Sequence, residues 1–162
     1  MNRNAKMKAI FPGSFDPFTA GHEALVYRAL QLFDEVIIAV GSNSEKRYMF
    51  SGDDRLEIVR TVFTDEPRIK TLQYSGLTID LCRNSNIFFL IRGLRTSADF
   101  EFERAIGQIN KQLEPRIETV FMLIAPEHSA VSSSIVRDVI INKGDPSILL
   151  PAGLDISKYV NK

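Results

Sequence analysis

The chain has 162 residues, 44% of them hydrophobic, and its twenty basic and twenty acidic residues give a net charge of zero. This length and apolar content suit one domain that buries about 70% of the surface its unfolded form exposes. Zero net charge removes any whole-chain attraction to nucleic acid or to an anionic membrane, so affinity for phosphate has to come from local clusters. The single cysteine, Cys82, excludes an internal disulfide and a cysteine-based zinc site, and its apolar surroundings indicate simple packing.

The basic N-terminal stretch is not followed by the apolar region of a signal peptide. No segment approaches eighteen uninterrupted apolar residues, which a membrane-spanning helix would need. We therefore expect a soluble, cytoplasmic protein whose residues 1–6 are flexible.

Apolar periodicity predicts strands and helices in regular alternation. In chain order, the expected elements are a strand at 9–11, a helix at 23–33, a strand at 35–40, a helix from the capping-box pair Ser51 and Asp54 to 63, a strand at 69–74, a helix at 77–83, a strand at 87–91, a helix at 98–113, a strand at 119–124 and a helix at 135–140. This alternation predicts a parallel, doubly wound sheet. We expect a single Rossmann-like α/β domain over residues 1–162, with a five-stranded parallel sheet and a C-terminal helical tail at 145–162.

The stretch 13–22, GSFDPFTAGH, joins the first predicted strand to the first predicted helix. A helix N-terminus offers free N–H groups and the positive end of the helix dipole to a phosphate, and Gly13 and Gly21 allow a ligand to approach the backbone. His22 falls in the first helical turn, facing such a ligand. An Asp-Pro turn or a histidine at a helix start is an ordinary structural feature when it occurs alone. Their combination between a strand and a helix favours a phosphate site.

Four segments are expected at the carboxyl edge of the sheet, where ligands bind in open α/β folds: 13–22, 42–47, 92–95 and 125–134. They lack the paired carboxylates of an acid–base hydrolase and a nucleophile with an adjacent base. Their side chains are instead cationic or hydroxylic, namely His22, Lys46, Arg47, Arg92, Arg95, Ser132, Ser133 and Ser134, with Arg137 close behind. Such a cradle suits phosphates, because arginine offers a planar fork that matches phosphate oxygens.

Each of these groups also has a structural explanation. One serine of the three is enough to cap the following helix, which leaves two hydroxyls for an anion. Arg92 and Arg95 can be surface cations, although their position directly after a buried strand favours a site. Lys46 and Arg47 lie beside Glu45, so a solvated charge cluster remains an alternative.

The stretch 13–22 resembles the G-[ST]-F-D-P-x-[HT]-x-G-H signature of the HxGH-type nucleotidyltransferases. Thr19 in the first position of the HxGH pair is similar to the phosphopantetheine adenylyltransferases, whereas the nicotinamide-mononucleotide and cytidylyl branches usually have His there. Two further segments extend the resemblance to that family, RGLR at 92–95 followed by ADFEFE at 98–103, and VSSS with Val136 and Arg137 at 131–137.

The resemblance implies transfer of the adenylyl group of ATP to 4′-phosphopantetheine, giving dephospho-coenzyme A and pyrophosphate. The acceptor's own phosphate would attack in line, so no covalent enzyme intermediate is needed and catalysis reduces to alignment and charge stabilisation. Mg²⁺ would arrive mainly on the ATP phosphates, with no dedicated protein metal site and with Asp16 as a candidate neighbour.

The resemblance also implies roles for matched residues. The catalytic residues would be His22, Lys46 and Arg95. Phosphopantetheine would be bound by Ser14, Lys46, Thr78 and Arg92. ATP would be bound by Ser14, Phe15, His22, Gly93, Leu94, Arg95, Glu103, His128, Ser129, Ala130, Val131, Ser132, Ser133 and Ser134. The chain departs from the family pattern at Ser14, where many members have Thr, and at His128, where Trp or Tyr is common.

Relatives with this pattern are commonly homohexamers, although nothing in the sequence itself shows a subunit interface, and feedback binding of coenzyme A stays open. One alternative function is another HxGH nucleotidyltransferase, with nicotinamide mononucleotide or a cytidylyl donor, and Thr19 argues against it. Another is a non-catalytic nucleotide-sensing module, against which His22, Lys46 and Arg95 argue. No nucleic-acid or membrane partner is expected, because no aromatic–basic face is present.

Overall fold

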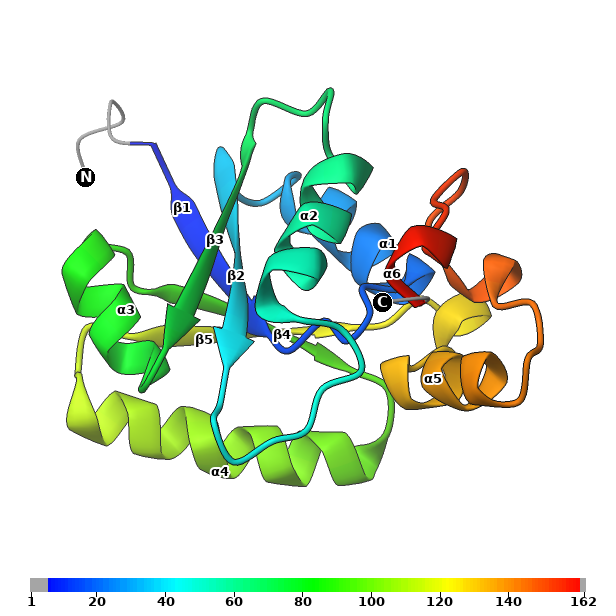
Figure 1. Ribbon diagram of the computed structural model, residues 1–162. Coiled ribbons are helices and arrows are strands. Elements are labelled where there is room, and N and C mark those ends of the chain that lie inside the picture. The colour runs from blue at the N-terminus through cyan, green and yellow to red at the C-terminus, as the bar shows by residue number, and fades with distance from the viewer. Residues whose placement is uncertain (1–5, 161–162) are drawn as a thin grey trace.

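The computed structural model describes residues 6–160, which form one five-stranded parallel sheet in the order β3-β2-β1-β4-β5 (Figure 1). The strands are β1 (Lys8–Gly13), β2 (Glu35–Ser42), β3 (Ile69–Ser75), β4 (Phe89–Leu94) and β5 (Glu118–Leu123). The helices are α1 (Ala20–Ala29), α2 (Gly52–Val62), α3 (Thr78–Ser85), α4 (Ser97–Leu113), α5 (Ser133–Ile141) and α6 (Ser157–Val160), with 3-10 turns η1 (Pro126–His128) and η2 (Ser147–Leu149). The expected α/β class and parallel sheet are confirmed.

The strand order reverses at β1, which pairs with β2 on one side and with β4 on the other. In a doubly wound sheet such a reversal opens a crevice beyond the carboxyl ends of the two strands that flank it. The loops after β1 and β4 therefore meet at this crevice, as the sequence predicted.

Helices cover both faces of the sheet, because successive strand residues point to opposite sides. Phe11 and Ile38 pack on one face in a cluster with residues of α1, α2 and α5. Ile10 and Ile37 pack on the other face, where Cys82 of α3 is fully buried. Burial raises the pKa of the Cys82 thiol to about 11, so this cysteine is a packing residue, as expected.

Several element boundaries differ from the sequence-based expectation, and the first helix also ends early, at Ala29 rather than at residue 33. Helix α1 begins at Ala20, three residues before Glu23, because Thr19 caps it. Strand β4 continues through Arg92 to Leu94 rather than ending at Ile91. Arg92 stays in the ladder because its main chain pairs with Phe121 of β5.

Helix α4 contains the predicted apolar stripe of Phe102, Ile106, Ile109 and Leu113, but none of its residues is buried. Phe102 is 67% exposed and Ile109 is 53% exposed. The helix lies along the sheet face opposite to α2 (Figure 1), and Phe102, Ile109 and Leu113 of the stripe are each more than half exposed. No helix formed by residues 6–160 is both long and apolar enough to cross a membrane.

The C-terminal segment from residue 145 to 160 contains η2 and α6, which are single helical turns. Ile156 and Tyr159 are buried against the larger core cluster, so this tail packs on the domain. Residues 1–5 of the segment expected to be flexible and residues 161–162 of the expected tail lie outside the described residues, while Lys6 is exposed.

Candidate active site

Side chains from other elements hold the segment that leads from β1 into α1. Four of its carbonyl oxygens accept hydrogen bonds: Pro12 from Arg92 Nη1 at 3.1 Å, Ser14 from Arg55 Nη1 at 2.5 Å, Asp16 from Arg137 Nη1 at 2.7 Å, and Pro17 from Ser133 Oγ at 2.8 Å. Three of the four donors are guanidinium groups, and charge-assisted bonds of this kind are the stronger ones. The protein itself therefore fixes the conformation of this segment.

The Asp16 side chain belongs to the same framework. Its carboxylate accepts hydrogen bonds from the main-chain N–H groups of Met49 and Phe50, both at 2.9 Å, and the residue is 4% exposed. Both oxygens are thus occupied by the segment before α2. The structure does not support Asp16 as a neighbour of a metal ion.

His22 is oriented by the capping of α1. The main-chain N–H of Thr19 donates to His22 Nδ1 at 3.0 Å, and the Thr19 hydroxyl lies 3.0 Å from the same nitrogen. Because Nδ1 is the acceptor, the ring proton sits on Nε2. Burial, together with the nearby positive charge of Arg95, lowers the pKa of His22 to about 4. The residue is therefore a neutral imidazole whose Nε2–H can donate a hydrogen bond.

Three phenylalanine rings support the His22 ring. The centroids of Phe15 and Phe18 lie 5.1 Å and 5.2 Å from it, and that of Phe11 lies 6.1 Å away. Phe15 is 3% exposed and adopts a φ of 48°, a backbone conformation rare outside glycine. The Phe15 side chain is therefore part of the hydrophobic core, and only the main chain of this residue is available to a nucleotide.

A cavity of about 240 Å³, which we call the donor cavity, lies in front of His22. It is bounded by the first turns of α1 and α5, so two helix N-termini flank it. Its lining includes the predicted ATP residues His22, Gly93, Arg95, Val131, Ser132, Ser133 and Ser134. The structure thus brings together residues that are more than 100 positions apart in the sequence.

Each of the three serine hydroxyls makes a hydrogen bond within the protein. Ser132 Oγ caps α5 by accepting from Ile135 N, and Ser133 Oγ donates to the Pro17 carbonyl. Ser134 Oγ accepts from Arg137 at 3.2 Å. Only Ser133 directs its O–H to a protein carbonyl, whereas Ser132 and Ser134 act as acceptors, so their O–H groups can still donate to an anion. The expectation of two available hydroxyls therefore stays a prediction, and the N–H groups at the start of α5 add a second anion-binding feature to this motif.

Arg95 and Gly93 shape the wall of the donor cavity at the end of β4. The Arg95 Nε lies 3.4 Å from the Asp99 carboxylate, which also accepts from Arg95 N, so the first turn of α4 orients this cation. A side chain at Gly93 would place its Cβ 2.7 Å from Leu25, so only glycine fits there. The neighbouring Leu94 is buried and offers a nucleotide only its main chain.

The segment His128–Ala130 lies beside the donor cavity and not in its lining. A Cβ built on Gly21 would be 3.5 Å from His128 Cβ, so His128 packs next to the first turn of α1. Ser129 Oγ donates to the Pro126 carbonyl at 2.8 Å. Of the predicted loop 128–134, the structure therefore places the second half at the cavity.

A second cavity of about 240 Å³, the acceptor cavity, opens at the ends of β1 and β2. Ser14, Lys46 and Arg92, three of the residues expected to bind phosphopantetheine, line it together. Lys46 is exposed on the loop after β2, while Arg47 beside it lines neither cavity. An exposed lysine and a partly buried arginine that line the same cavity suit a phosphate.

Arg92 also links the acceptor cavity to a smaller one of about 180 Å³ under α4. Its guanidinium pairs with the Glu103 carboxylate through Nε at 2.6 Å and Nη2 at 2.5 Å. Thr78, the fourth expected acceptor residue, lines this smaller cavity and lies 3.0 Å from the Tyr74 hydroxyl. Glu103, expected to bind ATP, lines this smaller cavity and not the donor cavity.

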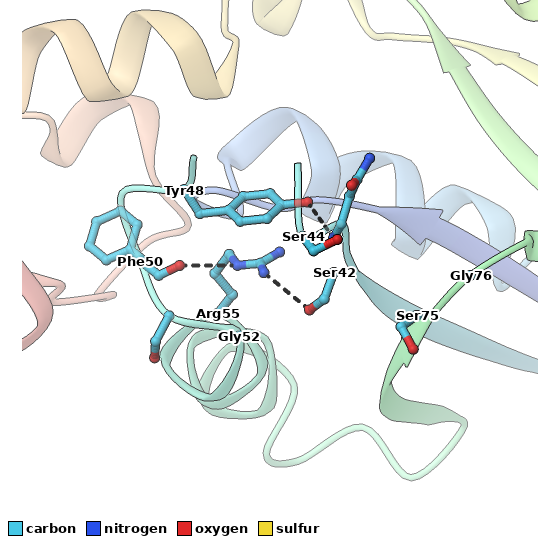
Figure 2. A pocket seen from close by; sticks show the side chains of 10 residues that line it. Ser42, Ser44, Tyr48, Phe50, Gly52, Arg55, Ser75 and Gly76 are labelled. Carbon is cyan, nitrogen blue, oxygen red and sulfur yellow. Dashed lines mark hydrogen bonds between the residues drawn. The ribbon is translucent and has the colours of Figure 1, made fainter. Parts of the chain in front are cut away.

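Sequence reasoning missed Arg55, which lines the largest cavity, about 790 Å³, beside the acceptor cavity (Figure 2). The two cavities share Ser42, Asn43, Tyr48 and Gly76. An arginine in the first turns of a helix usually points to solvent, so the sequence gives no signal that this one is buried. Among residues 6–160, no group of three or more His, Cys, Asp or Glu side chains can hold a metal ion.

A parallel sheet with a neutral histidine in one of two cation-lined cavities at its switch point is the arrangement that suits an α/β nucleotidyltransferase. In agreement, residues 10–139 match the cytidylyltransferase-like family. The chain is 54% identical over 149 residues to the phosphopantetheine adenylyltransferase of Flavobacterium psychrophilum, covering 92% of this chain and 98% of that one. It is 50% identical to that of Flavobacterium johnsoniae (93% and 99% covered) and 45% identical to that of Bacteroides thetaiotaomicron (93% and 99% covered). The chain belongs to the phosphopantetheine adenylyltransferase family.

Proposed function

We propose that this chain transfers the adenylyl group of ATP to 4′-phosphopantetheine, giving dephospho-coenzyme A and pyrophosphate in coenzyme A biosynthesis. The family membership supports the reaction, and one structural observation supports it independently. Phe11 and Gly93 line the donor cavity, whereas their chain neighbours Pro12 and Arg92 line the acceptor cavity. Consecutive residues of a strand point to opposite faces of the sheet. Neighbouring residues at the ends of β1 and β4 therefore line different cavities, and the two cavities meet at these strand ends. Such a pair suits two phosphorylated substrates that react with each other.

The chain's own residues act by alignment and by charge stabilisation. His22 Nε2–H donates to an oxygen of the α-phosphate, and Lys46 approaches the same group from the acceptor side. Arg95 and the N-terminus of α5 hold the β- and γ-phosphates that leave as pyrophosphate. Ser14 and Arg92 hold the phosphate of the acceptor, which attacks the α-phosphorus in line. No enzyme nucleophile is required, and preorganised donors of this kind typically supply the largest part of such catalysis.

The cavity under α4 suits the amide-bearing arm of the acceptor. Its walls combine the apolar side chains of Leu90 and Ile106 with the polar groups of Thr78 and Asn110. An elongated molecule whose phosphate lies at Arg92 can extend into it, because Arg92 lines both cavities. Asn110 is a residue that the sequence analysis did not single out.

Magnesium is proposed to bind through the ATP phosphates. The described residues offer no three-carboxylate cage, and Mg²⁺ is commonly held by substrate phosphates with few protein ligands. When bound, the metal neutralises phosphate charge. Feedback binding of coenzyme A and a cytoplasmic location stay predictions, which calorimetry with coenzyme A and cell fractionation would test.

The proposed function is tested by pyrophosphate release from ATP and Mg²⁺ with 4′-phosphopantetheine, with nicotinamide mononucleotide, or with no acceptor. We expect release only with phosphopantetheine, and a fall in kcat of about 10²–10³-fold in His22→Ala, because one oxyanion donor is lost. Release with nicotinamide mononucleotide would indicate another nucleotidyltransferase, and ATP binding without any release would indicate a sensing module. A fall of less than about tenfold in His22→Ala would contradict the role given to His22.

A further inference from the structure

The Arg55 guanidinium lies in the interior of the protein, beneath the Tyr48 ring (Figure 2). The residue is 1% exposed, and its guanidinium carbon is 4.0 Å from the centroid of that ring. Burial lowers the pKa of Arg55, and the Asp16 carboxylate opposes that effect. Burying an arginine is unfavourable unless its donors are satisfied, so its partners indicate what the residue does.

Those partners come from three separate segments. Arg55 Nη1 donates to the Ser14 carbonyl at 2.5 Å and to the Gly41 carbonyl at 2.8 Å. Arg55 Nε donates to the Phe50 carbonyl at 3.2 Å. One side chain thus joins the loop after β1, the end of β2 and the segment that precedes α2.

The loop between these attachment points contains Lys46. It leaves β2 after Ser42 and reaches Phe50, so Arg55 holds the main chain at both of its ends. Tyr48 stacks on Arg55, and its hydroxyl accepts a hydrogen bond from Asn43 N at 3.0 Å. This hydrogen bond connects two residues of the same loop. The separation between Ser14 and Lys46, which both line the acceptor cavity, therefore depends on Arg55.

We propose that Arg55 is a positioning residue that holds Ser14 and the Lys46 loop at the spacing that the acceptor's phosphate requires. The inference rests on the proposed function. Ser14 and Lys46 line the acceptor cavity and not the donor cavity, so the effect of Arg55 falls chiefly on the acceptor, with a fall in kcat in addition because Lys46 also approaches the α-phosphate. Lysine cannot replace it, because an ammonium group lacks the planar fork that reaches three carbonyls and stacks on a ring.

The test compares Arg55→Lys with Arg60→Lys, which changes an exposed arginine on the same helix. KM for phosphopantetheine, KM for ATP, kcat and the thermal midpoint are measured for both. We expect Arg55→Lys to raise the KM for phosphopantetheine about tenfold or more and the KM for ATP less than about threefold, while Arg60→Lys matches the wild type. A residue that only stabilises the fold would lower the active fraction, and hence kcat, without separating the two KM values.

Equal changes in the two KM values, or a fall in kcat alone, would overturn the inference and leave the proposed function intact. A wild-type protein inactive with phosphopantetheine would instead overturn the proposed function. If Arg55→Lys does not fold, Arg55→Gln, which keeps two donors, is read in the same way. If neither folds while Arg60→Lys does, Arg55 is a fold-stabilising residue and the positioning role is rejected.

Discussion

A single hydrogen bond decides how His22 can act. Because Nδ1 accepts from Thr19 N, the imidazole presents Nε2–H to the donor cavity while it is neutral. Protonation would add a hydrogen to Nδ1 and break that bond. With a pKa lowered to about 4 by burial, His22 stays neutral over the physiological range.

We therefore predict that kcat/KM shows no titration of His22 near its usual pKa of about 6.5. The pH–rate profile between pH 5 and 9 and the ring signals of His22 in NMR check this. The free energy of unfolding should fall as pH drops from about 6.5 towards about 4, because the unfolded state binds the proton first. His22→Gln should lose that part of the pH dependence. A rate limb near pH 6.5 that disappears in His22→Gln would contradict the assignment.

Glu103 is a second residue whose partner determines its role. Its bidentate pairing with Arg92 fixes the arginine that lines both acceptor-side cavities. We predict that Glu103→Gln raises the KM for phosphopantetheine by about tenfold and leaves the KM for ATP within about threefold, since removing one partner leaves Arg92 poorly oriented. Glu101→Gln, which affects an exposed pair with Arg104 on the same helix, is the matched control. A larger effect on the KM for ATP would instead support the ATP-binding role that the sequence resemblance implied for Glu103.

At the scale of elements, the residue that caps α1 also orients His22, for which we propose a catalytic role. Thr19 caps the helix and also holds the His22 ring. We predict that Thr19→Val lowers the free energy of unfolding by about 1 kcal/mol, because the cap is lost, and lowers kcat, because the ring loses the hydroxyl. Thr19→Ser keeps the hydroxyl and should restore both quantities. Urea denaturation and steady-state kinetics of the two variants measure them. Equal kcat in both would mean that the main-chain bond alone orients His22.

The type of each element, helix or strand, could be predicted from the sequence because the spacing of apolar residues and the positions of turn residues depend on local structure. The strand over 35–40 and the helix ending at Leu113 are examples, and each lies within two residues of its predicted boundaries. The roles of individual polar side chains did not follow. Ser133 and Arg137 find their partners 116 and 121 residues earlier in the chain, and Arg55 finds Ser14 41 residues earlier. No local pattern encodes such distant contacts, so the sequence analysis assigned Ser133 and Arg137 to an anion cradle although the fold uses them, and it did not single out Arg55.

At the scale of the whole molecule, four segments were expected to converge at one sheet edge, and they do. The sequence did not show that they divide into a donor and an acceptor cavity. That division arises because neighbouring residues of β1 and β4 face opposite sides of the sheet at the switch point. The predicted residue set was therefore largely brought together, whereas its partition between two substrates required the three-dimensional register.

The uncovered apolar stripe of α4 suits a subunit contact, as an oligomer such as the homohexamer implied by the sequence resemblance would need. An amphipathic helix normally buries such a stripe, and Phe102, Ile109 and Leu113 are each more than half exposed in the single chain. We predict that Ile109→Glu lowers the native mass, measured by light scattering after gel filtration, because a charge would be buried at a subunit contact. Gln108→Glu, on another face of α4, should leave the mass unchanged. A monomeric wild type, or an Ile109→Glu variant of unchanged mass, would show that α4 is not the interface.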